Sequence, residues 1–167
     1  GNDTKPLSIT TNGSAGNYRS TTTGIFIYNA AGGEMLRIVG GDPNGVNYNS
    51  WNTYIGNESG FSQPYDNSSA GYYNTGVGYQ SLYSNSIGHS NSAFGTQALY
   101  QNSTGNFNTT FGAFALDFNS TGSGNTSAGY QSLTDSTTGS DNTAFGYAAL
   151  GDNITGNYNV ALGRDAL

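Results

Sequence analysis

The chain has 167 residues, of which 34% are hydrophobic and 8% are charged, and its formal charge is −6. So few apolar residues argue against one large globular core, while the 13% aromatic content argues against disorder. The four basic residues are scattered, cysteine is absent, and no apolar run approaches the roughly 20 residues that span a bilayer, so we expect no nucleic-acid partner, no disulfide framework and no membrane insertion by this segment.

Residues 1–50 are predicted to form a small β element or cap. Ile25–Tyr28 and Met35–Val39 have the composition of strands, and Asn29–Gly33 between them is typical of a hairpin loop. The turn sequence Asp42–Gly45 marks the end of this region.

Residues 51–73 are predicted to form an irregular first coil with an inserted loop. Asn52–Gly56 matches a repeat found downstream, but it starts 22 residues before Asn74 instead of 17. We assign the five surplus residues to Phe61–Asp66, where Pro64 has no backbone N–H to donate to a ladder.

Residues 74–167 are a tandem repeat with a period of 17 residues. Asparagine, glycine and leucine recur at positions 1, 5 and 9 of the unit, and a second glycine recurs at position 15. The asparagines are Asn74, Asn91, Asn108, Asn125, Asn142 and Asn159, and the position-5 glycines are Gly78, Gly95, Gly112, Gly129, Gly146 and Gly163. Because helical-pair repeats and propeller blades need about 33 to 50 residues, this period predicts a parallel β-solenoid with two short strands and two turns per coil. The chain stops nine residues into a repeat, so we expect it to be a segment of a longer protein.

Strand alternation decides which side chains share a face. Within one unit it places Thr143 and Phe145 on one face and Asn142 and Ala144 on the other. We expect the face with the large residues to lie inside the coil, beside the leucines. The residues at its position 4 are Val77, Phe94, Phe111, Phe145 and Leu162, with Ala128 in the fourth copy, which should therefore pack loosely.

The small residues at position 3 are expected to approach a second chain. They are Gly76, Ala93, Thr110, Ser127, Ala144 and Ala161. Since each coil carries few large apolar residues, we expect association, with a closed homotrimer as the natural arrangement for a narrow rod. The asparagines have two interpretations, a ladder of hydrogen bonds between coils or simple turn chemistry.

The repeat also resembles a known family. Units such as Asn142–Leu150, with the sequence NTAFGYAAL, are similar to the head repeats of trimeric autotransporter adhesins, and similar repeats occur in phage and phage-like tail fibres. The resemblance covers residues 74–167 and part of 52–60. It implies a left-handed parallel β-roll that forms a homotrimeric extracellular fibre. The chain departs from the adhesin heads at Thr143 and Phe145, where those favour aliphatic residues, and in its slightly longer repeat.

No arrangement of residues in the sequence is typical of an enzyme. His89 is the only histidine and occupies a variable position of the repeat, where we expect it to be exposed. The aspartates form no regular acidic array for a metal or for glycoside cleavage. We therefore expect no catalytic residues, no metal and no cofactor.

Binding of a receptor on the host-cell surface, either a glycan or a protein, is expected at aromatic rings flanked by amide and hydroxyl groups. The alternative is that these rings cover the coil edges or the seam between chains. The candidate residues are Trp51, Phe61, Tyr65, Tyr79, Tyr83, Tyr100, Tyr130 and Tyr147.

These observations predict a structural and receptor-binding segment of a fibre outside the cell, on a virion, an injection particle or a bacterial surface. A purely structural shaft without a ligand of its own is the alternative. Ice binding is a minor alternative, because a hydroxyl row is formed by Thr75, Ser92, Thr109, Thr126 and Thr143. The expected position of this row inside the coil and its interruption at Val160 argue against ice binding.

Overall fold

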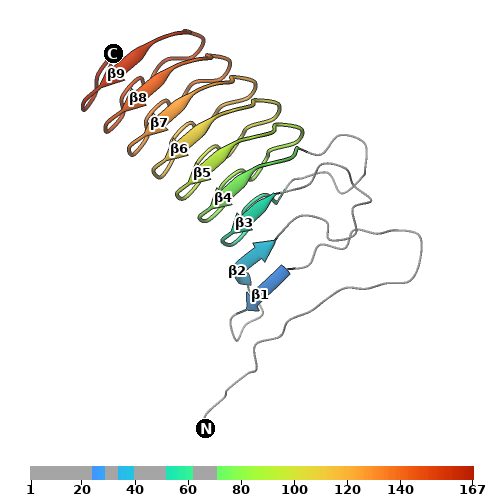
Figure 1. Ribbon diagram of the computed structural model, residues 1–167. Coiled ribbons are helices and arrows are strands. Elements are labelled where there is room, and N and C mark those ends of the chain that lie inside the picture. Colours follow the sequence, from blue (N-terminus) through green and yellow to red (C-terminus); the bar gives the residue numbers. More distant parts are fainter. Residues whose placement is uncertain (1–23, 29–33, 40–51, 62–70) are drawn as a thin grey trace.

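The protein is an all-β parallel solenoid of about five turns, with coils of about 17 residues. A computed structural model describes residues 24–28, 34–39, 52–61 and 71–167. Figure 1 shows the strands side by side, with the described coils stacked in chain order from β3 to the C-terminus. No helix occurs in these ranges, so none of them contains a helix that could cross a membrane.

The first two strands pair with each other in antiparallel orientation. They are β1, Gly24–Tyr28, and β2, Glu34–Val39, and β2 is also antiparallel to β3, Thr53–Ile55. Both strands lie where the sequence predicted strands. The loop Asn29–Gly33, the turn Asp42–Gly45 and most of the predicted cap lie outside the described residues.

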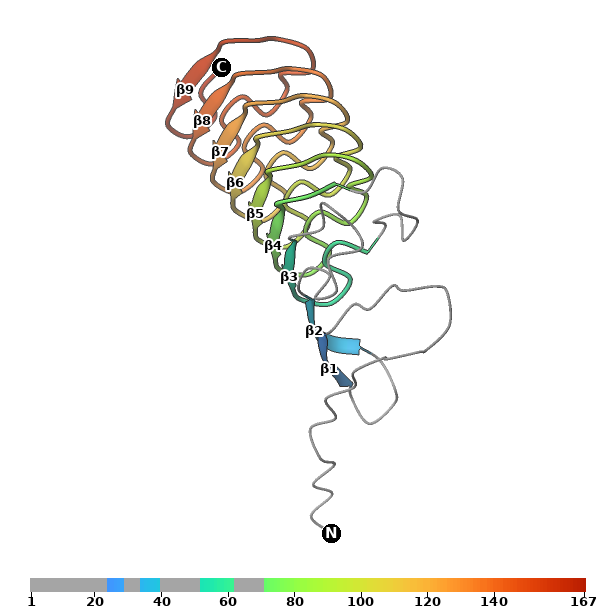
Figure 2. The same ribbon diagram turned by 45° about the vertical axis from the view of Figure 1, so that its right-hand side comes forward.

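From β3 onward every strand is parallel to the next and in perfect 17-residue register, apart from the 22-residue step between β3 and β4. The strands are β4 Thr75–Val77, β5 Ser92–Phe94, β6 Thr109–Phe111, β7 Thr126–Ala128, β8 Thr143–Phe145 and β9 Val160–Leu162. Each coil holds one three-residue strand, so the prediction of two strands per coil is wrong. As Figure 2 shows, the rest of each coil is a wide loop of turns that returns to the next strand.

Tight corners make this return possible. The position-5 glycines take positive φ, for example +135° at Gly78, a region that other residues rarely adopt. Residues at positions 7, 9 and 17 also have positive φ although most are not glycine, as Gln97, Leu99 and Phe107 illustrate with 53°, 55° and 58°. Each such residue costs about 1 kcal/mol or more, and the hydrogen-bonded stack of coils holds it in place.

Small side chains and one leucine per coil fill the interior. Leu82, Leu99, Leu116 and Leu133 are fully buried, and so are Ala93, Thr110, Ser127 and Ala144 at position 3. The space is tight, since a Cβ at Gly76 would lie 2.8 Å from Ser59 Oγ and 2.9 Å from Ser81 Oγ. The core is therefore built from the small column that was expected to face another chain.

The large residues at position 4 lie on the opposite, outward face of the strands. Phe111 is 50% exposed, Phe145 is 45% exposed and Leu162 is 69% exposed. The predicted faces are thus reversed, because a coil of this width has no room for a phenyl ring opposite the leucine. The fourth copy is not loosely packed either, because Ala128 lies on the outer face and leaves no gap inside the coil. On the inner face of the same strand, the Ser127 hydroxyl donates to the backbone oxygen of Ser132 at 2.9 Å.

The position-1 asparagines form a ladder between coils. The backbone N–H of Asn91 donates to Asn74 Oδ1 at 2.9 Å, and Asn74 Nδ2 donates to Gly88 O at 2.8 Å. The same pair of bonds recurs from coil to coil, and these side chains are buried in the central coils. Each amide therefore satisfies backbone groups that no strand partner reaches.

A second asparagine column at position 12 was not predicted. Asn102 Nδ2 donates to Asn85 Oδ1 at 2.6 Å, and Asn119 Nδ2 donates to Asn102 Oδ1 at 2.7 Å. The position-15 glycines make room for both columns. Gly105 has ordinary negative φ, but a Cβ there would lie 2.3 Å from both Asn102 Oδ1 and Gly122 O.

Candidate functional site

Two faces of the solenoid carry most of the exposed side chains that could bind a partner. The first is the outer sheet face, defined here as the outward residues at positions 2 and 4 of strands β3 to β9. Its position-2 row is Thr53, Thr75, Ser92, Thr109, Thr126, Thr143 and Val160, and its position-4 row is Ile55, Val77, Phe94, Phe111, Ala128, Phe145 and Leu162. Neither row contains a charged residue.

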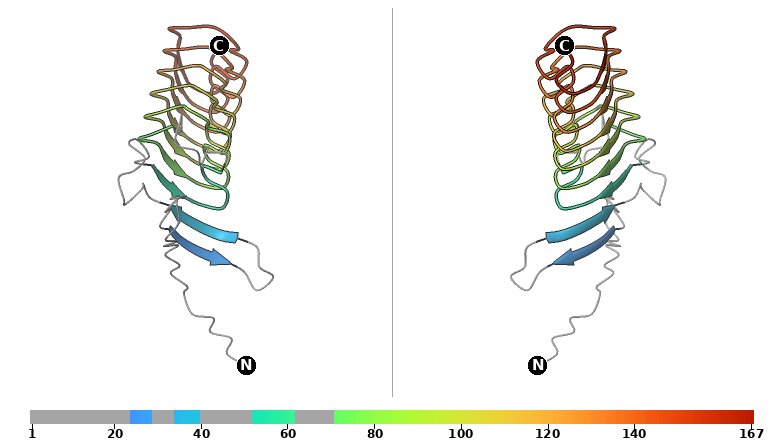
Figure 3. Two further views of the ribbon diagram at one scale, coloured as in Figure 1. Left: turned by 90° about the vertical axis from the view of Figure 1, so that its right-hand side faces the viewer. Right: turned by 90° about the vertical axis from the view of Figure 1, so that its left-hand side faces the viewer.

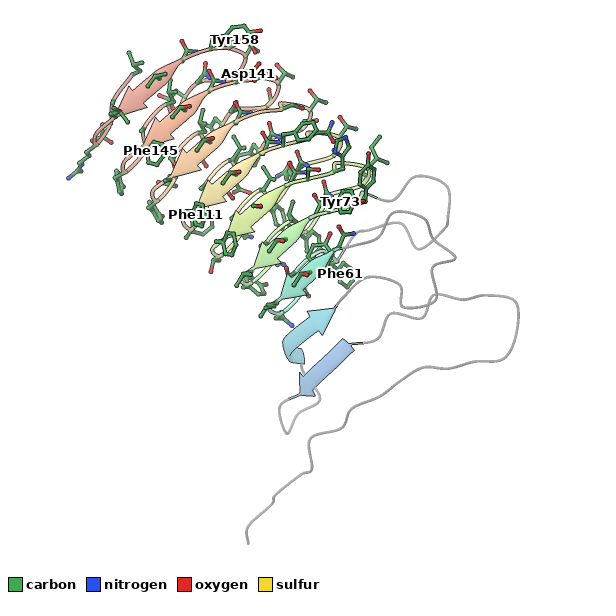
Figure 4. The ribbon with its side chains drawn as sticks, viewed as in Figure 1. Phe61, Tyr73, Phe111, Asp141, Phe145 and Tyr158 are labelled. Carbon is green, nitrogen blue, oxygen red and sulfur yellow. The ribbon has the colours of Figure 1, made fainter. Side chains whose placement is uncertain are left out.

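The second is the solenoid edge, defined here as the residues at positions 16 and 17, which precede each strand. Figure 4 shows Tyr73, Asp141 and Tyr158 along this edge, while Phe111 and Phe145 lie along the other end of the strands. The two side views in Figure 3 show the sheet on one side of the coil and the returning loops on the other. The edge therefore stays separate from the outer sheet face.

The predicted binding rings mostly stack on one another along the solenoid axis. Phe61 stacks on Tyr83 with centroids 5.2 Å apart, and Tyr83 stacks on Tyr100 at 5.0 Å. Tyr130 stacks on Tyr147 at 5.5 Å, and the guanidinium of Arg164 lies 5.1 Å from the Tyr147 centroid. Ring faces inside a stack are covered by the next coil, so these rings present their edges to solvent.

The structure thus divides the predicted site residues into several groups. Phe61, Tyr83 and Tyr100 form one stack, Tyr130 and Tyr147 form another, and Tyr79 is exposed with no ring contact to either. Trp51 and Tyr65 lie outside the described residues. Because Phe61 lies in the Tyr83 column and Gly71 lies one period before Gly88, the five inserted residues fall between Phe61 and Gly71, which is also outside the description.

Three rings at position 17 were missed from the sequence: Tyr73, Phe107 and Tyr158. They are 56%, 62% and 80% exposed. Backbone hydrogen bonds keep this position in register, as when Phe107 N–H donates to His89 O and Tyr158 N–H to Ser140 O, both at 3.1 Å. Their shared place in the repeat, immediately before the position-1 asparagine, was a signal that could have identified them.

His89 lies on the same edge but is only partly exposed. Its ring stacks on Tyr72 with centroids 4.7 Å apart and meets Phe107 edge to face at 4.9 Å. It has no carboxylate partner in the part of the chain that the structure describes, and there no three His, Asp or Glu side chains gather as they would around a metal ion.

Asp117 is the one aspartate that is buried among the described residues. It follows Tyr100 in the position-10 column, and its Oδ1 has no hydrogen-bond partner there. Burial, together with the nearby charge of Asp135, raises the pKa of Asp117 from 3.8 to about 6. Burial and the neighbouring Tyr83 also raise the pKa of Tyr100.

Comparison with known proteins does not identify the chain. No family model, no curated protein and no solved structure matches it.

Proposed function

We propose that this chain is a structural and receptor-binding segment of a homotrimeric extracellular fibre, as in a phage or phage-like tail fibre or a bacterial surface adhesin. One observation carries the proposal: a regularly laddered solenoid has an uncharged outer sheet face whose side chains are 50%, 45% and 69% exposed at Phe111, Phe145 and Leu162. The proposal assigns the segment no catalytic activity and no cofactor.

The outer sheet face supports self-association. A soluble monomer rarely exposes a long uninterrupted apolar row, and such rows usually mark a contact with another protein. Because the row repeats at every coil, the same row on a second copy can lie beside it along the whole solenoid. Closed symmetry then favours a ring of chains around the fibre axis, and we propose three left-handed rolls.

The mass in solution tests this association. We expect three times 17.3 kDa by sedimentation equilibrium, and a monomer for the double variant Phe111→Ser/Phe145→Ser, whose circular dichroism should match that of the wild type. The control is Phe118→Ser, which changes an exposed phenylalanine at position 11, away from the outer sheet face. A wild-type monomer would refute the trimer, and so would a double variant that keeps the trimer mass.

Receptor binding separates the full proposal from a purely structural shaft. Binding of the labelled chain to intact candidate host cells, lost after enzymatic removal of surface glycans or proteins, supports a receptor function. Binding to no cell type, together with a confirmed trimer mass, would leave only the shaft.

Ice binding has gained one supporting observation. The threonine row points outward, so the objection that it lies inside the coil no longer holds, and its hydroxyls repeat at the strand spacing of about 4.8 Å. Trimer formation through the same face would cover this row. Thermal hysteresis should therefore be absent from the trimer, and a clear hysteresis signal from a monomer would favour ice binding.

A further inference from the structure

We propose that the solenoid edge binds a neutral, linear polysaccharide that lies along the fibre axis across Tyr73, Phe107 and Tyr158. This inference rests on the proposed receptor-binding function and names its ligand and its site. None of the three rings belongs to the outer sheet face, so the site stays open when that face is covered by other chains.

The orientation of Tyr73 and Phe107 differs from that of the stacked rings beside them. Tyr72 and His89 are stacked within 8° of parallel, but Tyr73 stands at 82° to Tyr72 and Phe107 at 87° to His89. Tyr73 and Phe107 are therefore turned out of the stacking plane. A ring turned in this way can offer its face, and not only its edge, to a flat ligand.

The aromatic rings at position 17 are separated by coils that carry no ring at this position. Position 17 of the next coil is Ser90 after Tyr73 and Gly124 after Phe107, so no aromatic ring at position 17 of the next coil stacks on either ring. Two coils separate Tyr73 from Phe107, which amounts to about 9.6 Å at the strand spacing. That interval is close to the length of a disaccharide. Three coils separate Phe107 from Tyr158, which amounts to about 14.4 Å and is close to the length of three sugar units, so one extended chain can reach all three aromatic residues.

Polar groups lie between the rings along the solenoid edge. At Gly124 the coil has no side chain, and the Asp141 carboxylate folds over it, since a Cβ there would lie 2.4 Å from Asp141 Oδ1. On either side stand Asn106 and Asn157, whose Oδ1 atoms accept backbone N–H groups at 2.8 and 2.7 Å. Their Nδ2 groups donate no hydrogen bond within residues 52–61 and 71–167, so both are available to sugar hydroxyls.

Charge selects the class of polysaccharide. The chain carries −6, and the only charged side chain at positions 16 and 17 of residues 72–158, apart from the titratable His89, is Asp141. An anionic polymer would meet like charge at the centre of the site, whereas hydroxyls of a neutral sugar can donate to that carboxylate. Apolar ring faces with one acceptor and two donors therefore fit a neutral hexopyranose chain.

The test measures binding of the full chain to defined hexasaccharides by titration calorimetry. The probes are the neutral β-1,4-linked hexamers of glucose and of N-acetylglucosamine, the α-1,4-linked glucose hexamer, and the anionic hexamer of galacturonic acid. We expect at least one neutral hexamer to bind and the anionic hexamer not to bind. Phe107→Ala, Tyr158→Ala and Asp141→Asn should each weaken binding at least fivefold.

Matched controls separate a contact from a folding defect. Phe118→Ala removes another exposed phenylalanine, at position 11, and should bind like the wild type, and all variants should keep the wild-type mass and circular dichroism. Wild-type binding that is unchanged in Phe107→Ala and Tyr158→Ala would overturn the edge site.

If the wild type bound none of the neutral hexamers, this inference would be overturned as well, but not the proposed function. Glycan-dependent binding to host cells by a trimeric wild type would then place recognition elsewhere on the chain. A wild type that is monomeric and binds no cells would overturn the proposed function itself.

Discussion

Asp117 shows how one side chain can weaken an otherwise satisfied stack. Its carboxylate is buried without a partner for Oδ1, and its pKa is raised from 3.8 to about 6. The folded state therefore holds this proton more tightly than the unfolded chain between these two pH values. Stability should fall as the pH rises from about 4 to about 6, because folding must then bury a charge, and the penalty is fully present above that window.

The variant Asp117→Asn tests this account. The amide is neutral at every pH and has nearly the same shape, so at pH 7.5 the variant should be more stable by up to about 3 kcal/mol, and at pH 4 it should differ little from the wild type. Urea unfolding at both pH values measures the effect. The exposed Asp152→Asn is the control, and an equal effect of Asp117→Asn at both pH values would contradict the titration.

At position 15, the absence of a side chain on a single glycine lets neighbouring coils pack closely. A Cβ at Gly122 would lie 2.2 Å from Gly139 O and 2.4 Å from Asn119 Oδ1, so the coils would have to separate. We expect Gly122→Ala to cost at least about 3 kcal/mol in the free energy of unfolding. Gly151→Ala is the matched control, because the nearest atom to its Cβ is 3.2 Å away and its φ is not positive; it should change stability by less than about 1 kcal/mol.

The asparagine ladder at position 12 is interrupted in one coil. Ser136 replaces asparagine between Asn119 and Asn153, and both Asn119 Oδ1 and Ser136 Oγ are left without a partner. The replacement Ser136→Asn should let the new Nδ2 donate to Asn119 Oδ1 and to Gly139 O, as Asn102 donates to Asn85 and Gly105. Two buried hydrogen bonds predict a gain of about 2 kcal/mol, and a melting temperature several degrees higher.

A melting temperature that stays the same or falls in Ser136→Asn would show that the ladder cannot accept a side chain in this coil. The comparison with Ser136→Ala is informative here. Alanine removes the unpaired hydroxyl without adding a bond, so it should be neutral or slightly stabilising, and Ser136→Asn should exceed it.

The period of this fold was predictable from the sequence, and a ladder at position 1 was one of two interpretations, but the position-12 ladder and the faces of the strands were not predicted. Alternation fixes that Thr143 and Phe145 share a face, yet it does not say which side of the coil is inside. The size of the residues in each column held the answer. Position 4 varies from Ala128 to Phe145, whereas position 3 stays small after Tyr54, whose ring is buried in the one coil that has Gly60 in place of the leucine. A column of small residues fits opposite the leucines in a narrow stack.

Which candidate binding rings have an open face could not be predicted from the sequence either. The sequence groups Tyr83 with Tyr100, and Tyr130 with Tyr147, but it does not show that such rings stack and cover one another's faces. Rings in the position-17 column, interrupted by Ser90 and Gly124, have no such neighbour. A broken aromatic column is therefore the better sign of an open ring face than a continuous one.

At the scale of the whole molecule, the solenoid is a one-dimensional stack in which each coil contacts only its neighbours. All parallel pairs from β4 to β9 share the same register, and the hydrogen bonds of each ladder repeat every 17 residues. Any one central coil should therefore be removable if the cut preserves the period. Stability should fall by roughly the contribution of one coil and one interface between coils, without loss of the fold.

Deletion of residues 125–141 tests this directly, because it joins Gly124 to Asn142 and removes one complete period. Asn142 then takes the place of Asn125 above Asn108, and Phe145 lies beside Phe111, so we expect a folded chain with the same circular dichroism per residue. Deletion of residues 125–140 removes one residue fewer and shifts every later column by one position. The downstream strand residues that were buried would then face solvent, and the asparagines would miss their acceptors, so this variant should lose cooperative thermal unfolding. Equal stability of the two deletions would contradict a fold that is fixed by its 17-residue register.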